Sequence, residues 1–118
     1  MLSEAGIKQV YLACGPTDLR KSIDGLAALV KEAFELDPFS PSLFVFCNRQ
    51  RDKLKILYWD HNGFWLYYRR LERGRFQWPM DAGETTRVIS RRELSWLLDG
   101  LSLNQPKAHP EVRARRVL

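Results

Sequence analysis

The sequence contains little that binds metal. Its 118 residues include two cysteines, Cys14 and Cys47, and two histidines, His61 and His109. Structural zinc sites use about four Cys or His ligands in closely spaced pairs, and no such pair occurs here. Each cysteine instead lies in an apolar segment, which is typical of a buried free thiol in a reducing compartment. We therefore expect free thiols, no metal and no cofactor.

Long apolar runs are also missing, and we expect no secretory leader. No stretch reaches the roughly 18 apolar residues of a membrane-spanning helix. Residues 1–6 lack the basic and apolar regions of a signal peptide. We expect a cytoplasmic protein with no membrane partner. A chain of 118 residues fits one compact domain, and its 45% hydrophobic content excludes a wholly disordered chain.

Signature motifs of common enzyme classes are absent as well. The sequence has no glycine-rich phosphate loop, no dinucleotide-binding fingerprint, no nucleophile elbow and no zinc-protease motif. Carboxylates do occur near basic residues, at Asp18, Asp24, Asp52 and Asp60. A two-metal nuclease needs several carboxylates that converge on its ions, and helix capping and solvation account equally well for Asp18 and Asp24. We expect a protein that is not an enzyme and has no catalytic residue.

The positive charge is concentrated in two parts of the chain. The net charge is +5, yet residues 1–47 carry a net charge of −2 and residues 76–101 a net charge of −1. Residues 48–75 alone carry +5, and residues 102–118 add +3. A central cluster of this kind is either a solvated basic face or a surface for the phosphate backbone of DNA. Our candidate nucleic-acid-binding residues are Arg49, Arg51, Lys53, Lys55, Arg69, Arg70, Arg73 and Arg75.

Apolar segments bounded by turn residues predict a sheet of four to five strands. The expected strands span residues 9–14, 43–47, 54–59 and 64–71. The segment 43–47 is continuously apolar, which is typical of a central strand. Residues 75–78, between Gly74 and Pro79, are expected to form a short edge strand.

Two helices complete the expected fold. The first has Thr17 as its N-cap and ends before Pro38, and Gly25 inside it predicts a close approach to the sheet. The second begins with the capping box Ser90–Glu93, carries an apolar stripe that includes Leu101, and ends near Gly100.

The element order is therefore β-α-β-β-β-(β)-α, an α+β fold with a small, mostly antiparallel sheet. A single domain is expected over residues 1–101, followed by a basic, mobile tail at 102–118.

The pair Asn62-Gly63 predicts a tight turn between two strands, because both residue types tolerate the positive φ of a type I′ turn. This turn pairs Lys55 with Arg70 and Lys53 with Glu72. Like charges directly opposite each other are destabilising, and Glu72 offsets only part of that repulsion. A bound phosphate would offset the rest.

Side-chain alternation along this hairpin separates two faces. One face, expected to be the core, carries Leu57, Trp59, Phe64, Leu66 and Tyr68. The other carries Leu54, Ile56, Tyr58, Trp65, Tyr67, Arg69 and Leu71. It is either covered by the second helix or a partner subunit, or it is a stacking platform for unpaired bases. Tyr58, Trp65 and Tyr67 are our candidate interaction surface.

Four blocks of residues resemble a known family. They are Asp18–Leu26, Leu43–Lys55, Tyr58–Asp60 and Arg70–Pro79. From about Val10 to Gly100 the chain resembles, in order and spacing, the TnpB (Orf2) accessory proteins of insertion-sequence family sixty-six. These proteins are distinct from the far larger RNA-guided nucleases that share the name TnpB. The matching motif residues include Asp18, Arg20, Lys21, Asp24, Gly25, Trp59, Trp78 and Pro79, whereas Gln50 stands where many members have another arginine.

The resemblance implies a role in DNA transposition beside a separate transposase that carries the acidic catalytic residues. We expect a non-catalytic accessory protein that binds DNA, mainly through its backbone, the cognate transposase, or other proteins that the element encodes. The alternative is a protein-interaction module whose aromatic face docks the transposase without contacting DNA.

Overall fold

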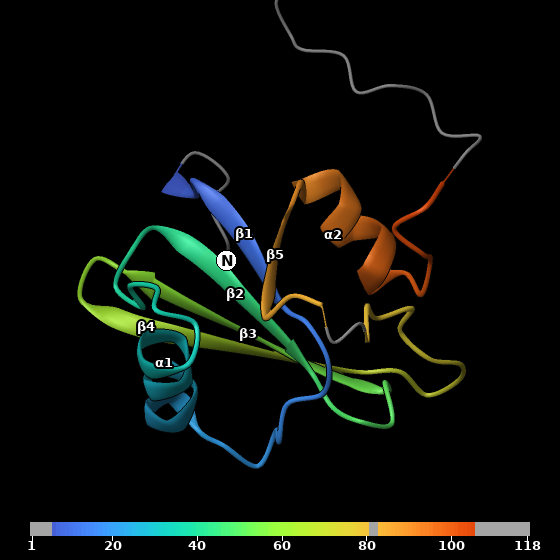
Figure 1. The fold of residues 1–118 in the computed structure, drawn as a ribbon, viewed down its shortest axis with the longest axis horizontal. Helices are drawn as coiled ribbons and strands as arrows, with labels where there is room; N and C mark the ends of the chain where they lie inside the picture. Colours follow the sequence, from blue (N-terminus) through green and yellow to red (C-terminus); the bar gives the residue numbers. More distant parts are fainter. Residues whose placement is uncertain (1–5, 81–82, 106–118) are drawn as a thin grey trace, which may run out of the picture.

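The computed structural model describes residues 6–80 and 83–105, and it shows one mixed sheet with a helix against each face (Figure 1). In chain order the elements are β1 (Gln9–Ala13), α1 (Ile23–Glu32), β2 (Ser42–Cys47), β3 (Lys53–Asp60), β4 (Gly63–Arg70), β5 (Thr86–Ile89) and α2 (Arg91–Leu98). The strand order is β4-β3-β2-β1-β5; β1 and β2 are parallel, and the other described pairs are antiparallel. The predicted α+β fold with a mostly antiparallel sheet is confirmed.

Strand β2 lies in the middle of the sheet, as its apolar sequence predicts. All six of its residues are buried, Ser42 included. A strand that is buried on both faces needs cover on both faces. Helix α1, which connects β1 to β2, covers one face with Leu26 and Val30. Helix α2 covers the other with Leu94 and Leu97.

Both faces of the hairpin contribute to the core. On the predicted core face, Leu57 is buried and Phe64 and Leu66 pack against the core under α1, as expected. Leu54, Ile56 and Tyr58, on the face predicted as an interaction surface, are 1%, 5% and 6% exposed and belong to the larger core under α2. The assignment of Tyr58 to an interaction surface is therefore wrong. On the predicted core face, Tyr68 is 55% exposed, so its assignment to the core is also wrong.

The hairpin register differs from the predicted one by two residues. Asp60 pairs with Gly63, so the turn residues are His61-Asn62, and Lys55 pairs with Tyr68. His61 has the positive φ, 59°, and Asn62 does not, so the type I′ turn is wrong. Because the shift is an even number of residues, every side chain keeps its predicted face.

Aromatic packing beside the turn accounts for this register. Trp59 pairs directly with Phe64, and their rings make an edge-to-face contact with centroids 5.0 Å apart. Phe39, from the loop before β2, packs against both rings at 5.0 and 5.4 Å. Such cross-strand aromatic pairs contribute about 0.2–1 kcal/mol each. The predicted register would place Leu66 opposite Trp59 and lose this contact.

Helix α1 begins at Ile23 with Ser22 as its N-cap, so the predicted start at Thr17 is wrong. Asp18 explains the delay. Its carboxylate accepts a hydrogen bond from the backbone N–H of Arg20 at 3.0 Å, which closes a local turn in place of a helical one. The helix therefore begins only after this turn.

Helix α2 begins as predicted. The Ser90 hydroxyl accepts from the Glu93 backbone N–H at 3.0 Å, and the Glu93 carboxylate accepts from the Ser90 N–H at 2.8 Å. Gly100 follows the helix with a φ of 81°, which favours glycine. Leu101 lies beyond the helix and is 45% exposed, so it does not extend the apolar stripe as expected.

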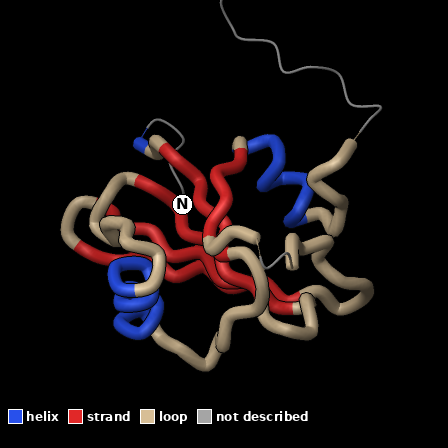
Figure 2. The backbone as a smooth tube through the Cα atoms, in the orientation of Figure 1, coloured by secondary structure: helices blue, strands red, loops and turns tan. Residues whose placement is uncertain are grey.

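The fifth strand is β5, at Thr86–Ile89, which sequence reasoning missed, and the predicted edge strand at 75–78 is wrong. Figure 2 shows the stretch after β4 as loop. Phe76 and Trp78 in this loop are 0% and 4% exposed and complete the core under α2. The Trp78 indole Nε1 donates to the Ala13 carbonyl at 2.9 Å. The loop is thus held by buried side chains and by single backbone hydrogen bonds, such as that from the Phe76 N–H to the Arg51 carbonyl at 2.7 Å, and not by a strand ladder.

Both cysteines are free thiols, as predicted. Cys47 is buried in β2, and burial raises the pKa of its thiol to about 12. Cys14 is only half-buried, which corrects the expectation that both are fully buried.

Residues 106–118, most of the predicted tail, lie outside the described residues, whereas Leu103 packs against the core. In the ranges 6–80 and 83–105, no helix has the length and apolarity to cross a membrane.

Replacement of Trp78 by Phe should lower the free energy of unfolding by about 1–3 kcal/mol, because the buried Ala13 carbonyl loses its indole donor. Urea denaturation followed by circular dichroism measures this loss. The matched control is Trp65→Phe, at a side chain that is 48% exposed, and it should stay within about 0.5 kcal/mol. Equal losses in the two variants would contradict the role given to the Trp78 hydrogen bond.

Candidate nucleic-acid interface

An open hollow of about 550 Å³ lies where the loop after β1, the turn after β2 and the β3–β4 pair meet. Because β1 and β2 are parallel, the segments that follow them leave the sheet at the same end. We call this site the basic hollow, since four of its lining side chains are basic and one is acidic. Its lining consists of Pro16, Thr17, Asp18, Leu19, Arg20, Asn48, Arg49, Gln50, Lys53, Lys55 and Tyr68.

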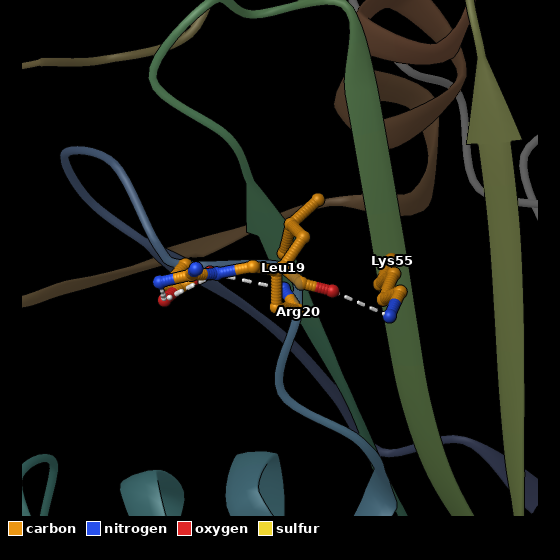
Figure 3. Close-up of polar contacts among 4 residues, drawn as sticks. Leu19, Arg20 and Lys55 are labelled. Atoms are coloured by element: carbon orange, nitrogen blue, oxygen red, sulfur yellow. Dashed lines mark hydrogen bonds and ion pairs between the residues drawn. The ribbon is translucent and has the colours of Figure 1, made fainter.

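The loop after β1 is held against the sheet by one backbone hydrogen bond and by the side chain of Lys55. The Thr17 N–H donates to the Cys47 carbonyl at 2.8 Å. Farther along, the Lys55 Nζ donates to the carbonyls of Leu19 and Lys21 at 2.6 and 3.2 Å, and Figure 3 shows the first of these contacts between the loop and β3. The main role of the Lys55 side chain is therefore to hold this loop against β3. Its charge lies at the wall of the hollow.

Asp18 and Arg20 form an ion pair on the same loop. The Arg20 Nη2 lies 2.8 Å from the Asp18 carboxylate, and its Nε also donates to that group. The Arg20 guanidinium holds the pKa of the Asp18 carboxyl well below its usual range. Asp18 thus stays ionised, while the Arg20 side chain remains 92% exposed. The outer part of this guanidinium is accessible to a ligand.

The turn after β2 is organised by the buried side chain of Asn48, whose role sequence reasoning missed. Its carbonyl oxygen accepts from the N–H groups of Asp52 and Lys53 at 3.1 and 3.0 Å, and its amide donates to the Asp52 carboxylate at 2.7 Å. The donation from Asn48 lowers the pKa of Asp52. This local network places Arg49 and Lys53 at the hollow.

Arg49 and Lys53 are the cations that remain available at this site. In the described part of the chain neither side chain has a hydrogen bond or an ion pair, whereas Arg20 and Lys55 are engaged by Asp18 and by backbone carbonyls. Both line the hollow together with the exposed ring of Tyr68. The arrangement offers positive charge and an aromatic ring to one ligand.

The other predicted basic residues lie elsewhere. Arg69 is on the opposite face and donates to the Leu98 carbonyl at 3.2 Å, near the end of α2. Arg70 pairs with Glu72 at 2.8 Å, and this contact raises the pKa of the guanidinium. The predicted Lys55–Arg70 opposition is wrong, because Arg70 lies opposite Lys53 and is neutralised by Glu72.

The remaining three do not line the hollow. Arg51 is half-buried with a φ of 61°, and Arg73 and Arg75 are exposed in the loop after β4. The eight predicted residues therefore do not form one surface. Instead, three of them join Arg20, which was singled out by its motif and not by the charge cluster.

Of the three residues of the candidate aromatic surface, Tyr58, Trp65 and Tyr67, only Trp65 is exposed. Trp65 is 48% exposed, stacks on Tyr67 at 6.0 Å and donates from Nε1 to Asp60 at 3.3 Å. Tyr67 is half-buried, and burial raises the pKa of its hydroxyl.

Several other motif residues maintain the fold. Trp78 lies in the core, the Pro79 carbonyl accepts from the Gly15 N–H at 2.9 Å, and Trp59 belongs to the aromatic cluster beside the turn. Asp24 is exposed in the first turn of α1, where it favours the positive end of the helix dipole.

Gly25 does not serve a close approach to the sheet, which corrects that prediction. A Cβ at this position would lie 3.2 Å from the Cβ of Lys21. The glycine thus makes room for the side chain of Lys21, in the loop that the Lys55 side chain holds.

The sequence matches the family described as IS66 Orf2 like protein over residues 8–108. It is 38% identical over 107 residues to the uncharacterized protein y4hO of Sinorhizobium fredii, a match that covers 91% of this chain and 92% of that protein. It is 34% identical over 109 residues to the uncharacterized protein y4jC of the same organism, covering 92% of each. No solved structure matches the chain.

The match spans every residue that lines the basic hollow. The chain therefore belongs to the IS66 Orf2 like family, whose members are accessory proteins associated with the transposition of insertion sequences.

Proposed function

We propose that this protein is a non-catalytic accessory factor of transposition that binds the phosphate backbone of DNA at the basic hollow. One observation carries the proposal: Arg49 and Lys53 line an open hollow, beside the exposed guanidinium of Arg20, and neither side chain makes a hydrogen bond or an ion pair among the described residues. Phosphate oxygens are the natural counter-charge for such a group, and backbone contacts supply much of the affinity of DNA-binding proteins.

The carboxylate in the hollow supports binding over catalysis. Asp18 is the acidic residue of the lining, and Arg20 engages it through both Nε and Nη2. Two-metal phosphoryl chemistry uses several carboxylates that converge on the ions. The lining of the hollow offers one carboxylate, which already has a cationic partner.

The charge distribution supports DNA as the partner. The four cations of the hollow come from three separate segments, the loop after β1, the turn after β2 and strand β3. The Thr17 backbone and the Lys55 side chain hold these segments together, so the segments that carry the cations are positioned before a ligand arrives. Such preorganisation lowers the entropic cost of binding.

Replacement of both Arg49 and Lys53 by Ala should weaken the binding of a fluorescein-labelled DNA oligonucleotide and reduce its salt dependence. Each lost phosphate contact should make the log–log slope of affinity against salt shallower by about 0.7–0.9. Fluorescence anisotropy over a salt series measures both quantities.

The matched control removes two cations that lie elsewhere, with Lys31→Ala near the end of α1 and Arg69→Ala on the opposite face. It should leave the slope unchanged. If the two double variants change the slope equally, the charge acts through the whole molecule and the assignment to the hollow is wrong.

Docking of the transposase is the second candidate function, and the exposed indole of Trp65 is the observation that favours it. It is weaker, because single exposed apolar side chains are common on protein surfaces. If docking is the function, capture of purified cognate transposase should survive nuclease treatment and be lost on Trp65→Ala.

A pull-down with nuclease-treated proteins measures this interaction. Tyr68→Thr, on the other face of β4, is the control and should leave capture intact. Capture that disappears with nuclease, or that is indifferent to Trp65→Ala, would contradict docking through this face.

A further inference from the structure

The ring of Tyr68 is an exposed aromatic surface inside the basic hollow. The side chain is 55% exposed although it lies within a strand, and it lines the hollow with Lys53 and Lys55. Lys55 is its direct cross-strand neighbour on β3. The strand pair therefore fixes the backbone of Tyr68 beside two cations.

Four other aromatic side chains of the hairpin, beside the turn or on the opposite face, contact other rings, whereas Tyr68 contacts none among the described residues. Phe39, Trp59 and Phe64 pack on one another, and Trp65 stacks on Tyr67. Within residues 6–80 and 83–105, no aromatic ring packs on Tyr68, and its hydroxyl makes no hydrogen bond. The exposed part of a ring that no other ring covers is available to stack with a ligand.

The dimensions and the charge favour one nucleotide as that ligand. A volume of about 550 Å³ falls within the roughly 300–1,000 Å³ of pockets that hold small ligands. Arg49 and Lys53 supply positive charge for a phosphate, and Tyr68 supplies a flat ring for a base. Proteins that bind unpaired strands combine these two elements, a basic groove along the backbone and aromatic rings for the bases.

We infer that the basic hollow binds an unpaired DNA strand, with one base stacked on Tyr68 and an adjacent phosphate on Arg49 and Lys53. The inference rests on the proposed function and adds a preference for unpaired DNA to it. In a duplex, both faces of an internal base are covered by its neighbours, so the ring of Tyr68 cannot stack on it. An unpaired base exposes its face, so only the unpaired strand uses both the cations and the ring.

The test compares a labelled single-stranded oligonucleotide with a duplex of the same sequence by fluorescence anisotropy, using the full chain. The wild-type protein should bind the single strand more tightly. Tyr68→Thr, which keeps a residue suited to a strand, should weaken single-strand binding by about 5-fold to 150-fold and leave duplex binding unchanged. Tyr68→Phe retains the ring and should bind as the wild type does.

A second readout reports stacking directly. A single strand that contains 2-aminopurine should lose fluorescence when it binds the wild type or Tyr68→Phe, and should keep its fluorescence at saturating Tyr68→Thr. Trp65→Ala, which removes an exposed ring from the opposite face of β4, should behave as the wild type.

The possible outcomes distinguish failure of this inference from failure of the proposed function. Equal affinity for the two DNA forms, unchanged by Tyr68→Thr, would overturn the inference and leave phosphate binding at the hollow intact. Failure of the wild type to bind either form would overturn both. A loss with Tyr68→Phe equal to that with Tyr68→Thr would overturn stacking, because the ring is present in one variant and absent in the other.

Discussion

The burial of strand β2 on both faces is the constraint on which the rest of the structure depends. An apolar strand in the centre of a sheet needs a covering layer on each side. One layer is α1, inserted between β1 and β2, and a crossover of this kind makes those two strands parallel. The other layer is α2 together with Phe76 and Trp78. Because β1 and β2 run in the same direction, the segments after them meet at one end of the sheet, and the basic hollow forms there.

Local polar contacts then give this end its shape. Asp18 closes a turn that delays α1, and so leaves a loop long enough to form one wall of the hollow. Asn48 closes the turn after β2, and Lys55 ties the loop to β3 through two carbonyl groups. One cation is thus used to build the site and another, Arg20, is paired with Asp18, which leaves Arg49 and Lys53 for a ligand. The number of basic residues at the hollow is therefore larger than the number of cations available to bind a ligand.

Much of the fold was predictable from short-range patterns. The continuous apolar segment 43–47 indicated the central strand, and the capping box at Ser90 indicated the start of α2, because both depend on neighbouring residues. The predictions were wrong where contacts between residues distant in the sequence determine the structure. The hairpin register follows a contact among Phe39, Trp59 and Phe64, and Phe39 is far from the hairpin in the sequence. The loop at 75–78 has strand-like residues, yet its side chains enter the core while β5 occupies the edge of the sheet.

The sequence by itself determined the fold class, the family, the segmental charge and the alternation of side chains along β3 and β4, because these depend on residue identity and local periodicity. The tertiary structure alone decided which of those charges share a site. Arg20 and Arg49 are distant in the chain and meet because parallel strands end at the same edge, whereas Arg69 and Arg70 are adjacent and point to opposite faces. It also decided that Tyr58 is buried and Tyr68 exposed, because Tyr58 lies in the core with α2, Phe76 and Trp78, whereas Tyr68 lines the open hollow.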